Sequence, residues 1–285
     1  MDLAFTKMHG CGNDFIVIDD REETLHLDSL AVAMLCDRHF GVGAGGVILV
    51  RPATDPTADY SMLYSNADGS IAEVCGNGIR VFARYLSSRG LVEAGHLNVQ
   101  TPGGLKALDI IPDETGAFAL ARVDMGVPVL TAADVPTTLP GDPVVGAHIV
   151  TDAGSAEVTC VSMGNPHAVL WVDEVDDAPV TTLGPAIEKL DVFPRGTNVE
   201  FAQVTDSSRI RLRVWERGVG ETMACGTGAC ATLVAGVITG RCGHSAIIEL
   251  PGGELRIEWL QPGSVFMTGP AQEVFEGVWH IPDED

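Results

Sequence analysis

The apolar residues of this chain fall mostly into short segments, several of which alternate with polar residues as in half-buried strands. The strand-like segments are 15–19, 47–50, 105–111, 209–215 and 253–259. Helical spacing occurs at 30–38, with Asp28 or Ser29 as the cap, and again at 79–86. Residues 229–239 are almost wholly apolar, which is typical of a buried helix. The pattern predicts an α+β fold in which a mainly antiparallel sheet wraps around a central helix.

Three short motifs occur twice, in the same order and at nearly the same offset. C-G-x-G begins at Cys75 and Cys225, offset by 150; P-G-G begins at Pro102 and Pro251, offset by 149; G-N begins at Gly12 and Gly164, offset by 152. A search for internal repeats therefore indicates two halves that share one fold.

The repetition divides the chain into two pseudo-symmetric domains. The N-terminal half is expected to span 1–125, to carry Cys75, and to be joined by the C-terminal tail at about 271–285. The C-terminal half is expected to span 126–270 and to carry Cys225. The stretch 127–143, rich in Pro and Thr, is the best candidate for the segment that crosses between the halves.

In each half a cysteine precedes a glycine-rich turn that opens a helix. The helix dipole and the free amides of the first turn favour a thiolate, so we expect a lowered thiol pKa. Glycine amides at a helix start can also hold a carboxylate. A single cysteine of this kind is usually a small core residue. Two equivalent cysteines brought to one cleft could act as base and acid on opposite faces of an α-carbon and invert it.

Composition narrows the function classes. The formal net charge of −22 over 285 residues argues against nucleic acid or an anionic membrane surface as a partner. The 7 cysteines are an odd number without zinc-like spacing, so we expect free thiols and no metal site. Lys7, Lys106 and Lys189 lack the phosphate-binding context of a pyridoxal enzyme, so no cofactor is expected. The N-terminus does not resemble a signal peptide, which favours the cytoplasm.

Seven segments together resemble the diaminopimelate epimerase family. They are H-G-C-G-N-D-F at 9–15, R-H-F-G-V-G-A-G-G at 38–46, N-A-D-G-S-I-A-E-V-C-G-N-G-I-R at 66–80, S-M-G-N-P-H at 162–167, G-T-N-V-E-F at 196–201, E-R-G-V-G-E-T-M-A-C-G-T-G-A-C-A at 216–231 and L-P-G-G-E-L-R-I-E-W at 250–259. The match runs from residue 5 to about residue 277. Asn77 separates the chain from proline racemase-like relatives, which typically read C-G-H-G at this motif.

The resemblance implies interconversion of LL- and meso-diaminopimelate, a diamino-dicarboxylate, for lysine and peptidoglycan precursor synthesis. It implies Cys75 and Cys225 as the acid/base pair, without a cofactor, and a homodimer with contacts near Phe266. His167 and Glu216 are similar to residues that tune the thiols. The implied substrate-binding residues are Asn13, Asn66, Gly76, Asn77, Asn165, Asn198, Glu216, Arg217, Gly226 and Thr227.

Several of these residues also have simpler interpretations. Asn66 and Asn165 could be turn formers, and Glu216 with Arg217 could be a solvated ion pair. His167 could be a structural core histidine, as His9 and His39 are expected to be. The chain also departs from the family in one place, because Gly45 stands where the family usually carries Asp, and Gly46 where some members place Gln. That departure bears on substrate preference.

Three other functions are compatible with parts of the sequence. An epimerase or racemase of the same fold could act on hydroxyproline or histidine. The glycine run at 41–46 suggests a dinucleotide-binding oxidoreductase, but it follows a helix and precedes a strand, which is the wrong order. Cys75 and Cys225 could instead form a redox sensor.

Overall fold

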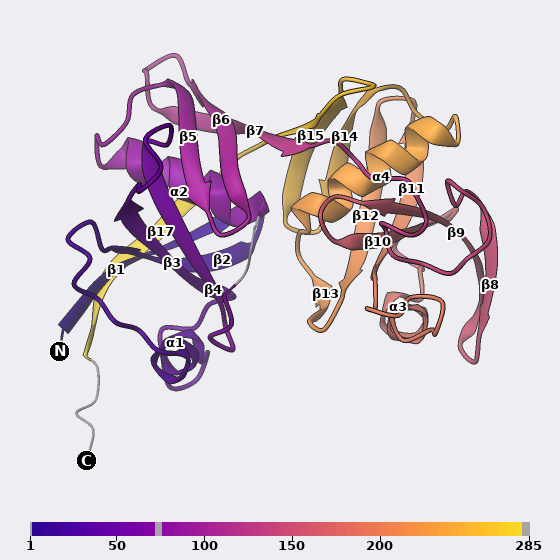
Figure 1. The fold of residues 1–285 in the computed structure, drawn as a ribbon, viewed down its shortest axis with the longest axis horizontal. Coiled ribbons are helices and arrows are strands. Elements are labelled where there is room, and N and C mark those ends of the chain that lie inside the picture. Colours follow the sequence, from indigo (N-terminus) through magenta and orange to yellow (C-terminus); the bar gives the residue numbers. More distant parts are fainter. Residues whose placement is uncertain (1, 72–75, 281–285) are drawn as a thin grey trace. The chain divides into compact units, whose positions relative to one another are not determined.

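The computed structural model describes residues 2–71 and 76–280, and the chain divides into two compact units (Figure 1). One unit takes its residues from 1–123 and 269–285, and the other from 124–268. The chain therefore returns to its first unit at the C-terminal end, where the last strand pairs with the first in antiparallel register.

The first unit begins with a strand pair and ends with the returning strand. Its elements are β1 (Asp2–Gly10), β2 (Asn13–Asp19), α1 (Ser29–Cys36), β3 (Gly46–Pro52), β4 (Tyr60–Asn66), α2 (Gly76–Ser88), β5 (Gly95–Thr101), β6 (Gly104–Pro112), most of β7 (Phe118–Gly126) and β17 (Gln272–His280).

The second unit has a similar succession of elements. They are β8 (Ala147–Thr151), β9 (Gly154–Ser162), β10 (Pro166–Trp171), α3 (Val180–Glu188), β11 (Asn198–Asp206), β12 (Arg209–Glu216), β13 (Gly220–Thr222), α4 (Gly226–Ile238), β14 (Ser245–Leu250), β15 (Gly253–Trp259) and β16 (Val265–Gly269).

Strand pairing follows the same order in both units. In the first, β1–β2 is antiparallel, β2–β3 parallel, β3–β4 antiparallel, β4–β5 parallel and β5–β6 antiparallel. In the second, β9–β10 is antiparallel, β10–β11 parallel, β11–β12 antiparallel, β12–β14 parallel and β14–β15 antiparallel. The expected α+β fold with mainly antiparallel pairing is confirmed, and each parallel pair has a helix between its strands.

The repeated motifs occupy corresponding places in the two units. Gly12 and Gly164 lie in the tight connections before β2 and β10, with φ of 78° and 96°. Gly104 and Gly253 close the β5–β6 and β14–β15 hairpins, with φ of 96° and 141°. These left-handed conformations favour glycine, which explains why the sequence repeats it there.

The helices that follow the two C-G-x-G motifs pack inside their sheets. Helix α2 contacts β1, β2, β3, β4 and β17, and α4 contacts β9, β10, β11, β14 and β15 (Figure 1). The first eleven residues of α4 are buried apart from Thr227, as its apolar sequence predicts. None of the helices in the described ranges is long and apolar enough to cross a membrane.

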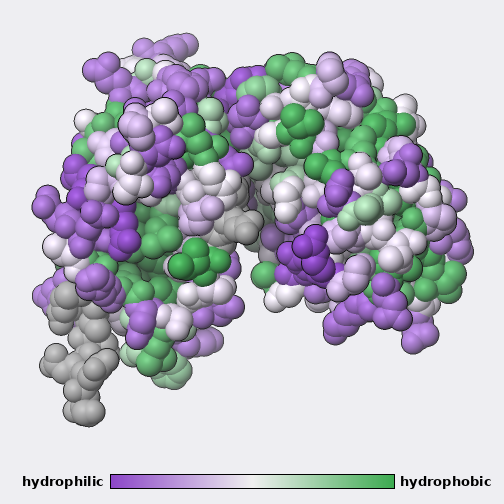
Figure 2. Space-filling model, in the orientation of Figure 1, coloured by the Kyte–Doolittle hydropathy of each residue, from purple (hydrophilic) through white to green (hydrophobic). Residues whose placement is uncertain are grey.

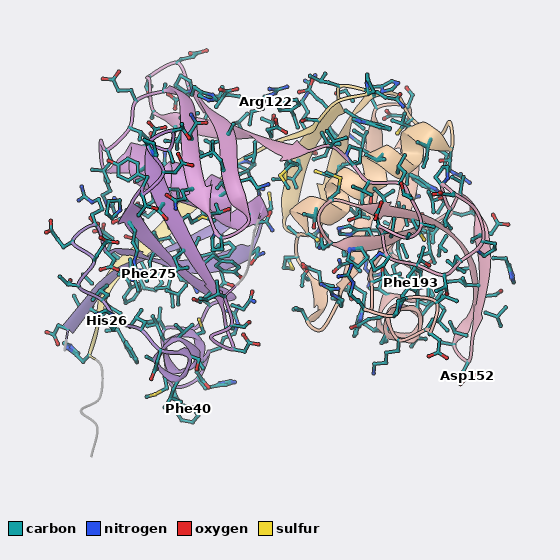
Figure 3. All side chains as sticks on the ribbon, viewed as in Figure 1. His26, Phe40, Arg122, Asp152, Phe193 and Phe275 are labelled. Carbon is teal, nitrogen blue, oxygen red and sulfur yellow. The ribbon has the colours of Figure 1, made fainter. Side chains whose placement is uncertain are left out.

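Of the two remaining helices, the sequence predicts α1 but not α3. Helix α1 is capped by Asp28, whose carboxylate accepts from the Ala31 amide over 2.8 Å, as expected. Helix α3 was not predicted, because it contains Pro185 and has no side-chain cap. Packing stabilises α3 instead: its apolar side chains join a core that includes Phe193 from the following loop (Figure 3).

Candidate active site

Cys225 is the N-cap residue of α4, as its place in the C-G-x-G motif indicates. The Gly228 amide donates to Cys225 Sγ over 3.4 Å, and Thr227 Oγ1 lies 3.5 Å from the same sulfur. A Cβ on residue 228 would come within 3.3 Å of Sγ and 2.8 Å of a Glu200 oxygen. Glycine at 228 is therefore what allows the thiol and the carboxyl group to lie so close to the helix.

The expected low pKa of this thiol is wrong for Cys225. Burial raises the pKa of Cys225 well above its ordinary value, and the nearby carboxyl groups of Glu216 and Glu200 raise it further. The hydrogen bonds from Thr227 and Gly228 lower the pKa, but by less. Cys225 therefore carries its proton at neutral pH in this structure.

Glu216 lies at the end of β12 and faces this thiol. Its carboxyl accepts a short hydrogen bond from the Thr222 hydroxyl, and it also interacts with the Cys225 thiol. Burial raises the pKa of Glu216 more than these hydrogen bonds lower it. Glu216 is thus half-buried beside the thiol, and the alternative of a solvated ion pair with Arg217 does not fit its contacts.

His167 is fully buried on β10 between two side chains. Its Nδ1 lies 2.7 Å from Glu200 Oε1, and its Nε2 lies 2.9 Å from Asn165 Oδ1. Burial raises the pKa of Glu200, and the His167 ring counteracts that rise. The histidine is therefore one member of a hydrogen-bonded chain that ends at Asn165, one of the residues expected to bind substrate.

Asn198 and Arg217 are joined to each other. Asn198 Nδ2 donates to the Pro166 carbonyl over 2.8 Å, and Asn198 Oδ1 accepts from the Arg217 amide over 3.0 Å. The Arg217 guanidinium donates to the Arg195 carbonyl over 2.9 Å. The observed contacts of Asn198 thus link the start of β10 to the turn that carries Arg217.

The structure therefore brings most of the C-terminal candidates together. Around the first turn of α4 lie Asn165, His167, Glu216, Gly226 and Thr227. Next to them are Asn198, at the start of β11, and Arg217, in the turn after β12. Backbone amides at the start of such a helix favour an anion such as a carboxylate.

In the first unit, Gly76 and Asn77 are buried at the start of α2, and Cys75 lies outside the described residues. Arg80, one turn later, is also fully buried. Its guanidinium donates to the Gly76 carbonyl over 3.1 Å and to the Pro270 carbonyl over 3.3 Å. It also lies 3.8 Å from Cys11 Sγ in the β1–β2 turn. Arg80 thus links the helix start to two neighbouring segments.

The other two candidates of this unit lie at strand ends. Asn66 ends β4, and its Nδ2 donates to Ser70 Oγ over 2.9 Å, so it does form a turn. Asn13 begins β2 and is half-buried. Its Oδ1 would lie 3.2 Å from a Cβ on residue 45. A side chain at position 45 would therefore touch a candidate substrate residue.

The second glycine of the family departure has a different explanation. A Cβ on residue 46 would come within 2.4 Å of the Ser65 carbonyl and 2.5 Å of the Tyr64 ring. Position 46 therefore has no room for a side chain in this chain, because Tyr64 fills that space. Of the two departures, only Gly45 lies next to Asn13, where a Cβ would be in tight contact with Asn13 Oδ1 and the Asp14 carbonyl.

Two buried charged residues were not among the sequence-based candidates. Glu200 follows Asn198 by two positions on β11, so the strand period places both on one face. That spacing was a signal for Glu200, which was visible within the G-T-N-V-E-F segment. Arg80 gave a weaker signal, because an arginine in the apolar pattern of a helix is usually exposed.

Comparison with known proteins agrees with this geometry. The family model described as diaminopimelate epimerase matches residues 5–131 and 159–274. The diaminopimelate epimerase of Pelotomaculum thermopropionicum is 49% identical over 278 residues, covering 96% of this chain and 98% of that protein. The diaminopimelate epimerase of a Synechocystis strain is 47% identical over 281 residues, covering 97% and 99%.

Solved structures show the same fold at much lower sequence identity. A hydroxyproline epimerase from Agrobacterium vitis has a TM-score of 0.69 and 16% identity, covering 97% of this chain and 92% of that chain. A PhzF-family phenazine biosynthesis protein from Bacillus anthracis has a TM-score of 0.70 and 16% identity, covering 99% and 100%. These two show the fold alone. From the family model and the near-half identity of full-length relatives, the chain belongs to the diaminopimelate epimerase family.

Proposed function

We propose that this chain interconverts LL- and meso-diaminopimelate by moving an α-proton between two cysteines, with no cofactor. The observation that carries the proposal is Cys225 at the cap of α4, with Glu216 beside it, in a chain 49% identical to a diaminopimelate epimerase. Such a reaction would supply the meso isomer for lysine and peptidoglycan precursor synthesis.

The protonation of Cys225 supports a role as the proton donor. Because its pKa is raised, the thiol keeps its proton at neutral pH and can donate it to the α-carbon. The residue that removes the α-proton from the other face would be Cys75, which is named by the resemblance. In the reverse direction the roles exchange. A thiolate made more basic by Glu216 and Glu200 then accepts a carbon-bound proton less unfavourably than an ordinary thiolate would.

The helix start would hold the carboxylate at the reacting centre. Amides of Gly226 and Thr227 are at the positive end of α4, and those of Gly76 and Asn77 are at the corresponding end of α2. Negative charge grows on this carboxylate as the α-proton leaves. Fixed amide donors therefore stabilise the transition state more than the ground state.

Arg217 and the asparagines would bind the distal, non-reacting end of the substrate. An arginine can meet a carboxylate with two parallel hydrogen bonds, while amide side chains donate and accept without adding charge. A hydroxyproline lacks a second amino-acid end. The chain's Arg217 therefore favours diaminopimelate over the alternative substrates of the same fold.

The deciding experiment is α-proton exchange in D2O with LL-diaminopimelate, under reductant and without added cofactor. Deuterium uptake together with the meso isomer is the expected result. A folded, reduced protein that exchanges no deuterium would reject this substrate, and a panel of hydroxyproline, proline and histidine would then test the alternatives. A redox sensor would show no exchange with any of them.

We also infer a homodimer that uses β17. The resemblance places contacts near Phe266, which is only half-buried on β16. More exposed apolar side chains lie on β17, where Val274, Phe275 and Val278 are 55%, 48% and 54% exposed. Figure 2 shows hydrophobic residues among polar ones on the surface of this unit. A second copy of the chain would cover the apolar side chains of Val274, Phe275 and Val278.

Measurement of the molar mass by light scattering tests whether Phe275 on β17 or Phe266 on β16 lies in the dimer interface. Phe275→Lys is expected to give a monomer and Phe266→Lys a dimer, while Phe40→Lys serves as a control because Phe40 is an exposed aromatic residue after α1 (Figure 3). A dimeric Phe275→Lys variant would remove β17 from the interface. We further propose a cytoplasmic location, since Cys36, Cys160, Cys225 and Cys242 are free thiols. Fractionation against a periplasmic marker tests it.

A further inference from the structure

Glu200 is a fully buried carboxyl group that the two-cysteine reaction does not use directly. It lies on β11, and its Oε1 is 2.7 Å from His167 Nδ1. Its Oε2 has no hydrogen-bond partner within the ranges 2–71 and 76–280. A buried carboxyl of this kind is costly, so its hydrogen bond to His167 matters for the fold and for the orientation of the ring.

The hydrogen-bonded chain has a fixed direction. The carboxyl of Glu200 and Nδ1 of His167 share one proton, whichever of the two atoms carries it. Nε2 of His167 faces Asn165 Oδ1 over 2.9 Å, and an oxygen acceptor requires Nε2 to be protonated. The amide of Asn165 therefore turns its oxygen towards the ring and its Nδ2 group away from it.

Glu200 is also held against the start of α4. A Cβ on Gly228 would come within 2.8 Å of Glu200 Oε1, and the Gly228 amide is the donor to Cys225 Sγ. The carboxyl therefore cannot move towards the helix without meeting its first turn.

We propose that Glu200 is a positioning residue, which acts through His167 to present the Asn165 Nδ2 group as a hydrogen-bond donor to a carboxylate or carbonyl oxygen of the substrate. This role rests on the proposed function and deepens it, because it names how one substrate contact is oriented. A histidine held by a carboxylate in this way directs the partner on its other nitrogen. Loss of Glu200 would free the ring and allow the Asn165 amide to rotate.

Two variants separate the hydrogen bond from the shape of the side chain. Glu200→Gln keeps a donor for Nδ1, so its KM for LL-diaminopimelate is expected to stay near that of the wild type. Glu200→Met has a similar length and no hydrogen bond. Its KM is expected to rise roughly tenfold or more, with a much smaller change in kcat, as for loss of one good substrate hydrogen bond. Glu157→Gln, on the exposed side of β9, is the control.

Nitrogen-15 spectra of the histidine rings test the geometry without any turnover. His167 Nε2 is expected at the position of a protonated nitrogen, with the resonance assigned by its loss in His167→Gln. In Glu200→Gln, Nδ1 is expected at the position of an unprotonated nitrogen, with Nε2 still protonated. An unprotonated Nε2 in the wild type would overturn the proposal, as would a folded Glu200→Met variant with wild-type KM. If the wild-type protein had no epimerase activity, the proposed function would be wrong. The nitrogen-15 spectra would then still test whether Glu200 orients the His167 ring.

Discussion

Helices α2 and α4 have the same length and begin with the same kind of motif, yet their first turns carry different charges. In α2 the fifth residue is Arg80, a buried cation that donates to the Gly76 carbonyl. In α4 the corresponding residue is Cys230, a buried cysteine. Glu200 and Glu216 lie around the start of α4 instead. Similar backbones therefore place a cation inside one helix start and two carboxyl groups around the other.

This difference shows how far the start of a helix determines the pKa of the cysteine that precedes it. The dipole and the amides act in the same direction in both helices, so they cannot distinguish the two cysteines. Neighbouring side chains decide instead, since burial and two carboxyl groups outweigh the amide at Cys225. The following predictions test the contrast, beginning with the largest effect.

Removal of either proposed thiol is expected to have the largest effect. Cys225→Ala and Cys75→Ala should each slow conversion of LL- to meso-diaminopimelate about 100- to 10,000-fold, the usual contribution of a positioned acid or base. Chiral chromatography of the product measures both rates. Near-wild-type turnover in either variant would mean that only one helix start performs proton transfer, and the two-thiol mechanism would be wrong.

Substitution of the fifth residue of α2 or of α4 is expected to lower the stability of the protein by different amounts. Arg80→Met removes donors from the Gly76 and Pro270 carbonyls, and should lower the free energy of unfolding by about 3 kcal/mol. Cys230→Ala deletes one buried sulfur and should cost about 1 kcal/mol. Urea denaturation measures both. Equal losses would contradict the view that Arg80 holds three segments together.

Alkaline pH should weaken both units through their buried thiols. Burial raises the pKa of Cys36 to about 11 and that of Cys160 to about 12, from an ordinary value of 9.0. Above pH 9 the unfolded chain loses these protons while the folded chain retains them, so unfolding becomes more favourable. The contribution of these thiols to the free energy of unfolding is thus fully present below about pH 9. It falls by up to about 1.4 kcal/mol per pH unit for each thiol as the pH rises towards 11 or 12.

Cys160→Ala gives the corresponding measurement. Its free energy of unfolding should depend less on pH than that of the wild type between pH 9 and 10.5. Cys242, whose pKa burial raises to about 11, offers a less buried comparison. An unchanged slope in Cys160→Ala would show that this thiol ionises at its ordinary pH in the folded chain.

The smallest expected change is a shift in the reactivity of Cys225. Glu216→Gln removes a negative charge that raises the pKa of this thiol, so the pKa should fall. Alkylation by iodoacetamide, followed by peptide mass spectrometry, should therefore reach half its maximal rate at a lower pH than in the wild type. Glu221→Gln, an exposed change on the neighbouring β13, is the control. A midpoint at the same pH would show that Glu216 does not raise the pKa of Cys225.

The sequence predicts elements whose signals are local. The cap at Asp28 and the alternation of 253–259 correspond to observed element ends, because capping and strand period depend on adjacent residues. Helix α3 was missed, because its stability comes from packing of residues such as Ile187 against strands distant in the chain. Local propensity alone argues against a helix that contains Pro185.

The site was predictable in its residue types and less so in its electrostatics. Glu216 and His167 could be named from motifs, but the raised pKa of Cys225 depends on burial and on distances across strands. Asn198 illustrates the same limit. Its amide bonds to Pro166 and Arg217, and this bridging arrangement exists only once β10 and β11 are paired.

The cap of α4 has a consequence for amide exchange with solvent. A neutral thiol is a poor acceptor, so the Gly228 amide that points to Cys225 Sγ is weakly protected whenever Cys225 carries its proton. A thiolate is a much stronger acceptor and would close the first turn of the helix more firmly. Hydrogen exchange at this single amide therefore records the protonation of Cys225, and each proton that the thiol gives up tightens the end of the helix that holds it.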